Sequence, residues 1–144
     1  MTRKDWALLV IAAAQGKPVS PVQLQKALFL IGQTLTPTQL QTQIFYDFAP
    51  YDYGPFDGAI YLDAEQLERE GLVSINFPPL RSREYVATPA GVQHAAALEA
   101  NLTPGVTHYL DEVVQWVSSL SFNELVRAIY AKYPAMKVNS VFRE

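Results

Sequence analysis

The apolar residues of this sequence recur mostly at helical spacing, with one stretch that has the character of strands. A first helix is predicted from about Lys4 to Gln15, because Gly16 ends its apolar pattern. A second helix is predicted to start after Ser20, whose hydroxyl can cap it, with Pro21 at the first helical position. By the same reasoning we expect further helices over residues 37–43, 57–70, 88–98, 103–117 and 121–133.

A β-hairpin is predicted between two of these helices. Residues 72–77 and 83–87 are short strand candidates, joined by a turn that contains Pro78 and Pro79. A last stretch, residues 136–142, is expected to dock as an extended strand. We therefore predict a mainly α fold with a small two-stranded β-hairpin, arranged as a winged-helix-like single domain over residues 1–144.

The segment 44–56 is the most unusual part of the sequence, because it combines many aromatic residues with two prolines and a glycine. Prolines and glycine prevent a regular helix, and the aromatic content is too high for a solvated loop. We expect an ordered, packed connection. Core packing is the favoured interpretation for most of its aromatic residues, namely Phe45, Phe48, Tyr53 and Phe56.

The amino-acid composition supports a single domain and limits the classes of partner that it can bind. The chain has 144 residues, of which 49% are hydrophobic and 17% charged, enough for one core and too few charges for disorder. A formal net charge of -3 gives nucleic acid no general electrostatic attraction. The absence of cysteine excludes disulfides, thiolate zinc sites and cysteine nucleophiles. The apolar stretch from Trp6 to Ala14 is too short for a membrane span and lacks a following cleavage site, so we expect a cytoplasmic protein without membrane contact.

No recognisable set of catalytic or metal-binding residues is present in the sequence. His94 and His108 are the only histidines, and Glu112 is spaced to pair with His108 on a helix face. Asp47 and Asp52 form a conceivable acid–base pair, but aspartates that cap turns are commoner. The sequence contains no phosphate-binding loop and no nucleophile with its base and orienting group. We therefore expect no enzymatic activity, no metal and no cofactor.

A winged helix raises the alternative of DNA binding, in which the helix before the hairpin enters the major groove. That helix carries a single arginine against carboxylates that phosphates would repel: Asp57, Asp63, Glu65, Glu68 and Glu70. The wing offers Arg81 and Arg83, and either Lys26 or the N-terminal pair Arg3 and Lys4 is expected to join them. The alternative function is therefore a winged-helix DNA-binding transcriptional repressor that uses these basic residues.

Several runs of the sequence resemble the Panacea (SocA-like) antitoxin domain family. The main ones read Pro50-Tyr51-Asp52-Tyr53-Gly54-Pro55-Phe56, Leu67-Glu68-Arg69-Glu70-Gly71-Leu72-Val73 and Tyr85-Val86-Ala87-Thr88-Pro89-Ala90-Gly91. Weaker similarity includes Leu24-Gln25-Lys26-Ala27-Leu28-Phe29-Leu30, Tyr130-Ala131-Lys132-Tyr133-Pro134 and Asn139-Ser140, so the resemblance extends from about residue 5 to 142. It implies a mostly helical domain that neutralises a cognate toxin by direct contact, or presents a partner to a protease as an adaptor. Asp52 and Asp57 depart from the family's pattern.

We therefore predict a non-catalytic, protein-binding regulator of the antitoxin type, with a toxin or a protease target as its partner. Tyr46 and Tyr51 are expected to stay exposed as interface anchors, because tyrosine is large, rigid and amphipathic. The acidic face of the helix over 57–70 is expected to lie beside them. The predicted partner-binding residues are Tyr46, Tyr51, Asp52, Tyr53 and Phe56.

Overall fold

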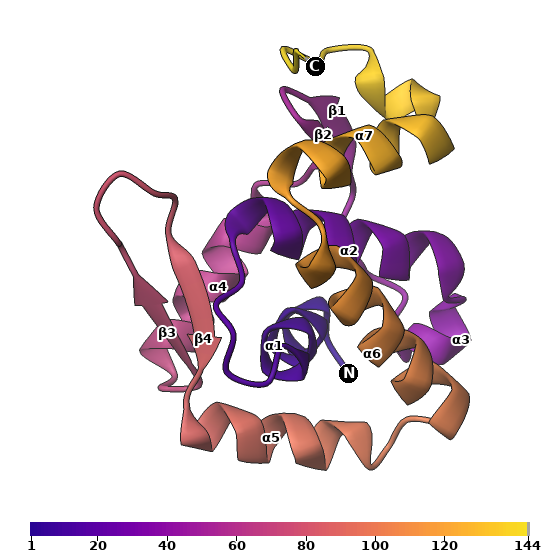
Figure 1. The fold of residues 1–144 in the computed structure, drawn as a ribbon. Coiled ribbons are helices and arrows are strands. Elements are labelled where there is room, and N and C mark those ends of the chain that lie inside the picture. Colours follow the sequence, from indigo (N-terminus) through magenta and orange to yellow (C-terminus); the bar gives the residue numbers. More distant parts are fainter. Residues whose placement is uncertain (144) are drawn as a thin grey trace.

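Helix α1 (Arg3–Ala13) is the centre of the fold, because its sequence leaves it no polar side. The computed structural model describes residues 1–143. Every residue from Trp6 to Ile11 is buried, and Figure 1 shows α1 almost end-on between the other helices. The one polar atom of the Trp6 ring, Nε1, donates a hydrogen bond of 2.9 Å to the carbonyl of Leu40, so the indole is buried with its polar group satisfied.

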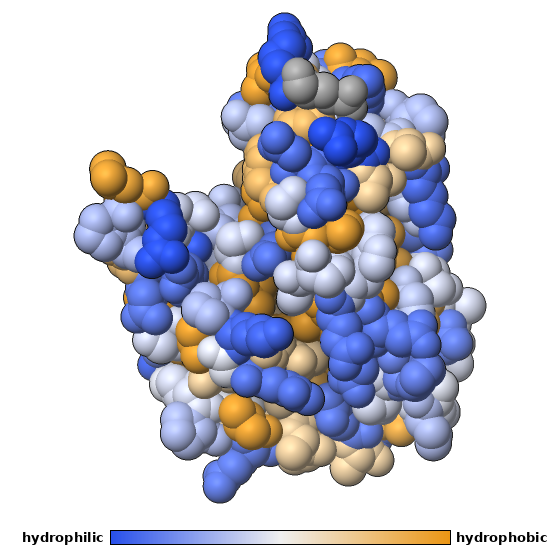
Figure 2. All heavy atoms as spheres, viewed as in Figure 1, coloured by the Kyte–Doolittle hydropathy of each residue, from blue (hydrophilic) through white to orange (hydrophobic). Residues whose placement is uncertain are grey.

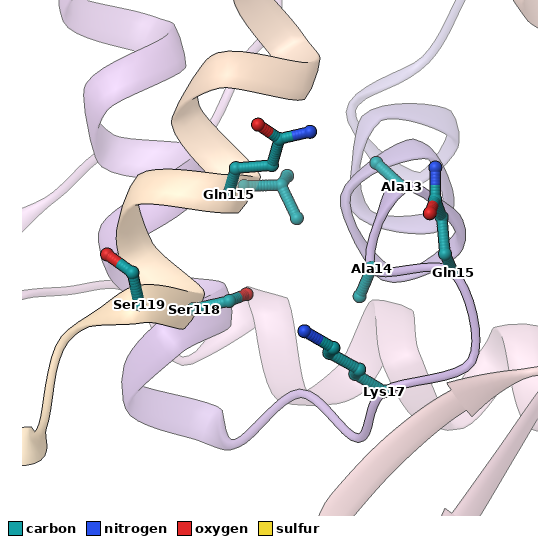
Figure 3. A pocket seen from close by; sticks show the side chains of 8 residues that line it. Ala13, Ala14, Gln15, Lys17, Gln115, Ser118 and Ser119 are labelled. Carbon is teal, nitrogen blue, oxygen red and sulfur yellow. The ribbon is translucent and has the colours of Figure 1, made fainter.

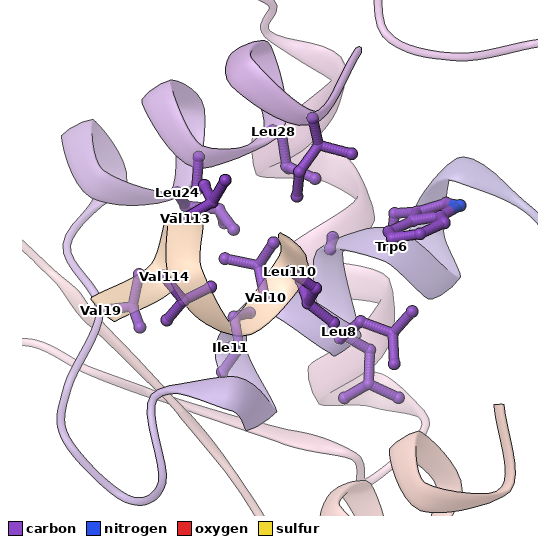
Figure 4. Packing of buried hydrophobic residues seen from close by; sticks show 14 of the residues in the cluster. Trp6, Leu8, Val10, Ile11, Val19, Leu24, Leu28, Leu110, Val113 and Val114 are labelled. Atoms are coloured by element: carbon purple, nitrogen blue, oxygen red, sulfur yellow. The ribbon is translucent and has the colours of Figure 1, made fainter. Parts of the chain in front are cut away.

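Four helices contact α1 from different directions: α2 (Pro21–Thr34), α4 (Ala59–Arg69), α5 (Pro89–Glu99) and α6 (Pro104–Ser119). Figure 4 shows part of this packing, in which Leu24 and Leu28 from α2 and Leu110 from α6 lie around Val10 and the other apolar side chains of α1. Of these helices, α4, α5 and α6 each bury one face and keep the opposite face in solvent, whereas α2 is buried at every position from Leu24 to Ile31.

The predicted hairpin forms the wing. It consists of β3 (Val73–Asn76) and β4 (Glu84–Ala87), which pair antiparallel. Val19, in the connection between α1 and α2, forms a bridge with Tyr85 of β4, and the two residues exchange backbone hydrogen bonds of 2.9 and 2.8 Å. The wing is thereby tied to the helices. The mainly α, winged-helix-like fold with a small hairpin is confirmed.

A second hairpin, which the sequence did not predict, lies within the aromatic segment. Its strands β1 (Ala49–Tyr51) and β2 (Gly54–Phe56) pair antiparallel, with Pro50 opposite Pro55. Neither proline has an N–H, so this pair exchanges no backbone hydrogen bonds, which is why the prolines argued against strands. The turn requires Gly54, because its φ of +106° is unfavourable for residues with a side chain. The expected packing holds for part of the segment, because Phe45 and Phe48 pack against the core, whereas Ile44, Tyr51 and Tyr53 are exposed.

Helix α7 (Phe122–Lys132) packs against this hairpin and forms a lobe with it at the top of Figure 1. A short 3₁₀ helix, η1 (Pro134–Lys137), follows. The extended strand predicted over 136–142 is wrong, because this part of the chain turns back on itself after α7. It meets the hairpin instead through a backbone hydrogen bond of 2.9 Å from the N–H of Val141 to the carbonyl of Asp52.

Some predicted boundaries differ from the observed ones by a few residues. Helix α3 (Pro37–Leu40) is shorter than the predicted range 37–43. Gly58, not Asp57, occupies the cap position of α4. The Asp57 carboxylate nevertheless accepts a hydrogen bond of 2.9 Å from the N–H of Ala59, so it still stabilises the start of this helix.

Gly91 and Gly105 provide a test of how tightly α5 packs on the segment that leads into the wing. Both lie in the first turn of a helix, but a Cβ at Gly91 would lie 1.9 Å from the carbonyl oxygen of Leu72, whereas one at Gly105 would meet no atom within 4 Å. We expect Gly91→Ala to lower the free energy of unfolding by about 1–3 kcal/mol, because the backbone must shift. Gly105→Ala should change it by less than about 1 kcal/mol, in the stabilising direction. Urea unfolding followed by circular dichroism measures both, and equal stabilities would contradict the packing.

Candidate functional site

The turn of the β1–β2 hairpin brings together most of the predicted partner-binding residues. Tyr51, Asp52 and Tyr53 lie in or beside the turn, and Phe56 ends β2. Tyr51 and Tyr53 are exposed, although core packing was the favoured interpretation for Tyr53. Asp52 and Phe56 are half-buried. These four residues form a continuous stretch of surface on one hairpin.

Tyr46 is buried, so the prediction that it is an exposed anchor is wrong. Only 7% of the Tyr46 surface is exposed to solvent. Its hydroxyl donates a hydrogen bond of 2.6 Å to Asp63 on α4, and Arg3 donates one of 3.2 Å to the same carboxylate oxygen. Burial and the hydrogen bond to Asp63 raise the pKa of Tyr46. Tyr46 therefore anchors the aromatic segment to the helices instead of contacting a partner.

Lys26 is buried too, and it does not lie with the wing arginines. Only 3% of the residue is exposed, so its prediction as a DNA contact is wrong. Its Nζ donates to the carbonyl of Pro55 at 3.4 Å, and no carboxylate of residues 1–143 lies within 4.0 Å of Nζ. Burial lowers the pKa of Lys26 to about 8. An ammonium group that residues 1–143 provide with no counter-ion therefore lies beneath the hairpin.

Aromatic rings connect the hairpin with the wing. Tyr51 stacks on Phe56 with ring centroids 4.7 Å apart, and Phe56 lies 6.0 Å from the ring of Tyr61 on α4. The guanidinium of Arg83 lies over Tyr61 at 5.1 Å and over Phe77 of the wing at 5.3 Å. We call Tyr51, Phe56 and Tyr61 the aromatic row.

On the other side, the hairpin turn is held by α7 and the residues after it. Tyr53 meets Phe122 of α7 edge to face, with centroids 5.1 Å apart. The hydroxyl of Ser140 donates to the carbonyl of Asp52 at 3.2 Å and accepts a hydrogen bond of 2.6 Å from Tyr130. The turn is therefore fixed through its backbone, while the Asp52 side chain takes no part in these bonds.

Lys26 and the aromatic row enclose a small cavity, which we call the hairpin pocket. Its volume is about 170 Å³. Figure 2 shows that this face of the molecule is hollowed between the wing and the lobe of α7, β1 and β2. The pocket is lined by Pro21, Val22, Gln25, Lys26, Tyr51, Asp52, Tyr53, Gly54, Phe56 and Tyr61.

The carboxylates of α4, predicted as an acidic contact face, are largely engaged within the chain. Asp63 binds Arg3 and Tyr46, as described above. Glu65 lies 3.8 Å from Arg83, and Glu68 accepts a hydrogen bond of 3.2 Å from the N–H of Ile75. Glu70 pairs with Lys4, whose hydrogen bond lowers the pKa of Glu70. This helix therefore offers little free negative charge to a partner.

The wing tip is apolar as well as basic. Leu80 is fully exposed and Phe77 is mostly exposed. Arg81 is exposed and lies 3.6 Å from Glu84, while Arg83 is held by Glu65 and the neighbouring rings. The two wing arginines are therefore not equivalent, and neither lies with Lys26.

A larger recess of about 340 Å³ lies between the end of α1 and α6. Figure 3 shows Lys17 and Ser118 pointing toward each other across it. None of the predicted site residues lines this recess, and its position is independent of the hairpin pocket.

Within 1–143, no group of three or more His, Cys, Asp or Glu residues is placed to hold a metal ion. No helix of this part of the chain is long and apolar enough to cross a membrane. His108 and Glu112 form the expected pair on the surface of α6, with Nε2 and Oε1 2.5 Å apart.

Sequence reasoning missed the residues that other elements contribute to the site. Tyr61 and Phe122 lie on helices outside the aromatic segment, and their periodicity gave no sign that their rings meet the hairpin. Lys26 was identified as basic but assigned to the wrong surface. A usable signal was its position within the apolar run Leu24–Leu30, where a lysine is surrounded by core residues.

Comparison of the sequence with protein-family models gives no match, and comparison with curated proteins gives no significant match.

The buried charge of Lys26 predicts a pH-dependent stability. The folded chain releases this proton near pH 8, whereas the unfolded chain keeps it to its ordinary value of 10.5, so the free energy of unfolding rises with pH between these values. We expect Lys26→Met to increase the free energy of unfolding by about 1–3 kcal/mol at neutral pH. This gain in the free energy of unfolding should shrink as the pH is raised to about 9.5. Above that pH the deprotonation of Tyr85, whose pKa is raised to about 12, also contributes to the pH dependence of stability.

Urea unfolding of both proteins across this pH range measures the effect. A Lys26→Met variant that is less stable than the parent at neutral pH, or a gain that does not change with pH, would contradict the buried, unpaired ammonium.

Proposed function

We propose that this chain is a non-catalytic, protein-binding regulator of the antitoxin type, acting in the cytoplasm on a cognate toxin or a protease target. The observation that carries the proposal is the cluster of exposed aromatic residues at the β1–β2 turn. Tyr51 and Tyr53 expose large rings on a turn whose backbone is fixed by Ser140 and Val141. Rigid, amphipathic rings on a fixed backbone lose little entropy on binding, as expected of interface anchors.

The surface beside these rings also favours a protein partner. Phe122 of α7 and Leu80 and Phe77 of the wing are exposed apolar residues on the elements that flank the hollow in Figure 2. Exposed apolar groups collected around a concave face are typical of protein-binding surfaces. The resemblance to Panacea antitoxins supplies the class of partner, a toxin or a protease target.

The same geometry gives less support to the alternative function, sequence-specific DNA binding. Of the basic residues proposed for it, Lys26 is buried and Arg83 is engaged with Glu65 and Tyr61, which leaves Arg81 exposed at the wing. The helix that would enter the groove presents Leu62, an exposed leucine, together with carboxylates. Specific DNA binding depends on several basic contacts to phosphates, and this surface offers few of them.

Co-purification of the tagged chain from extracts of its own cells, with and without nuclease, distinguishes the two functions. A discrete protein that survives nuclease and is identified by mass spectrometry supports the proposal. Nucleic acid that is lost at moderate salt, with binding abolished by combined Arg81→Ala and Arg83→Ala, supports the repressor instead.

With the partner identified, growth provides the test of antitoxin function. Expression of the partner alone should arrest growth, and co-expression of this chain should restore it. For a protease target, the chain should instead shorten the partner's lifetime. A partner that is neither toxic nor degraded faster in the presence of the chain would exclude both forms of the proposed regulator.

Tyr53 and Trp116 provide a matched pair for mapping the contact, because each is 41% exposed. Tyr53 lies at the hairpin turn, whereas Trp116 lies on α6 and belongs to none of the ring contacts described above. We expect Tyr51→Ala and Tyr53→Ala each to weaken partner binding about tenfold or more, and Trp116→Ala to leave it within about twofold. Asp52→Lys, which reverses the charge at the turn, should also change the affinity.

Calorimetric titration of the purified partner into each folded variant measures these effects. Equal loss of affinity in the Tyr53 and Trp116 variants would exclude the hairpin as the specific contact surface.

A further inference from the structure

Lys26 lines the hairpin pocket, and no carboxylate of the described residues 1–143 pairs with its ammonium. A lysine ammonium has three N–H donors, and the hydrogen bond to the Pro55 carbonyl, at 3.4 Å, is at the long end of the normal range. The end of the Lys26 side chain lies directly beneath Gly54, since a Cβ built there would be in ordinary contact with it, 3.4 Å from Cε and 3.5 Å from Nζ. The neighbouring Gln25 amide provides no help, because both of its polar atoms are bonded to the backbone of Asp57 at 2.9 and 3.0 Å.

The fold itself does not explain a charged residue at this position. An unpaired buried charge is unfavourable, and an apolar side chain of similar volume fills the same space at no such cost. The backbone around the pocket is already fixed by other contacts, among them the Gln25–Asp57 hydrogen bonds and those of Ser140. The charge therefore becomes favourable when a group of opposite sign enters the pocket.

The pocket's walls and size define the chemistry of that group. The aromatic row and Val22 provide apolar surface around a single cation. A volume of about 170 Å³ is close to the roughly 150 Å³ that holds a benzene ring in an apolar cavity. A single ammonium matches the single charge of a carboxylate, whereas phosphate sites normally gather several donors or an arginine.

We propose that the hairpin pocket binds a carboxylate carried on an apolar or aromatic stem, with the Lys26 ammonium as its counter-ion and the aromatic row around the stem. The carboxylate belongs either to an acidic side chain of a partner polypeptide or to a free organic acid. In the first case the inference rests on the proposed function and specifies the partner's chemistry. In the second case it is a small-molecule site of its own.

Among the described residues that line the pocket, Asp52 is the one acidic residue, and it defines a second variant. Its carboxylate is more than 4.0 Å from the Lys26 ammonium and lies on the turn at the edge of the pocket. A like charge there repels an incoming carboxylate. Asp52→Asn should therefore strengthen carboxylate binding about two- to fivefold.

The test uses phenylacetate and phenylacetamide, which share a ring and differ in charge. Each is titrated into the isotope-labelled full chain at constant ionic strength, and backbone amide signals are followed by NMR. We expect phenylacetate to shift the signals of Lys26, Tyr53 and Gly54 saturably and to bind about tenfold or more tightly than phenylacetamide. Lys26→Met, which should fold, should lose this preference. Lys17→Met is the matched control, because Lys17 lines the separate recess beside α6, and it should keep the preference.

Equal affinity for the acid and the amide, or a preference that survives Lys26→Met, would overturn the proposal. A blocked Glu-Phe dipeptide distinguishes the sources: tighter binding than phenylacetate assigns the carboxylate to a polypeptide, and weaker binding assigns it to a free acid, and both outcomes support the site. No partner protein is needed for these titrations, so their result is independent of whether a toxin or a protease target is found.

Discussion

Burial of α1 on every side is the constraint on which the rest of this structure depends. A helix with an uninterrupted apolar run from Trp6 to Ile11 has to be covered all round, and no single neighbour is wide enough to do so. The covering helices α2, α4, α5 and α6 are therefore arranged around it, and α2 is itself buried at every position from Leu24 to Ile31. The bridge between Val19 and Tyr85 then fixes the wing, because it joins the connection that leaves α1 to strand β4.

The aromatic segment is a second layer built onto this core. Tyr46 attaches it to α4 through the Asp63 carboxylate, which Arg3 of α1 also binds, so one half-buried carboxylate joins three parts of the chain. These polar contacts occupy the acidic side of α4. The exposed rings of the hairpin then remain as the prominent apolar groups on that part of the surface. Buried Tyr46 holds the segment to the helices, whereas exposed Tyr51 is available to a partner.

Lys26 connects this architecture to binding. Its stem packs within α2 among core residues, but its ammonium ends beneath a hairpin that offers it one carbonyl. The charge makes the pocket less stable than an apolar one, and in the proposed site the same charge selects an anion. A loss of stability at a binding site that is recovered when the ligand is bound is a common feature of functional sites.

Sequence by itself determined the helices, the wing and the order in which they follow one another. Local signals carry that information: Ser20-Pro21, Thr88-Pro89 and the spacing of apolar residues act within one or two helical turns. Of the site, it identified the aromatic segment and the exposure of Tyr51. Only the tertiary structure decided that Tyr46 is buried, that Lys26 faces the hairpin and that the carboxylates of α4 bind other groups of the same chain. The physical reason is that burial and pairing depend on residues distant in the chain, such as Asp63 for Tyr46 and Pro55 for Lys26, and no local pattern encodes which of them will meet.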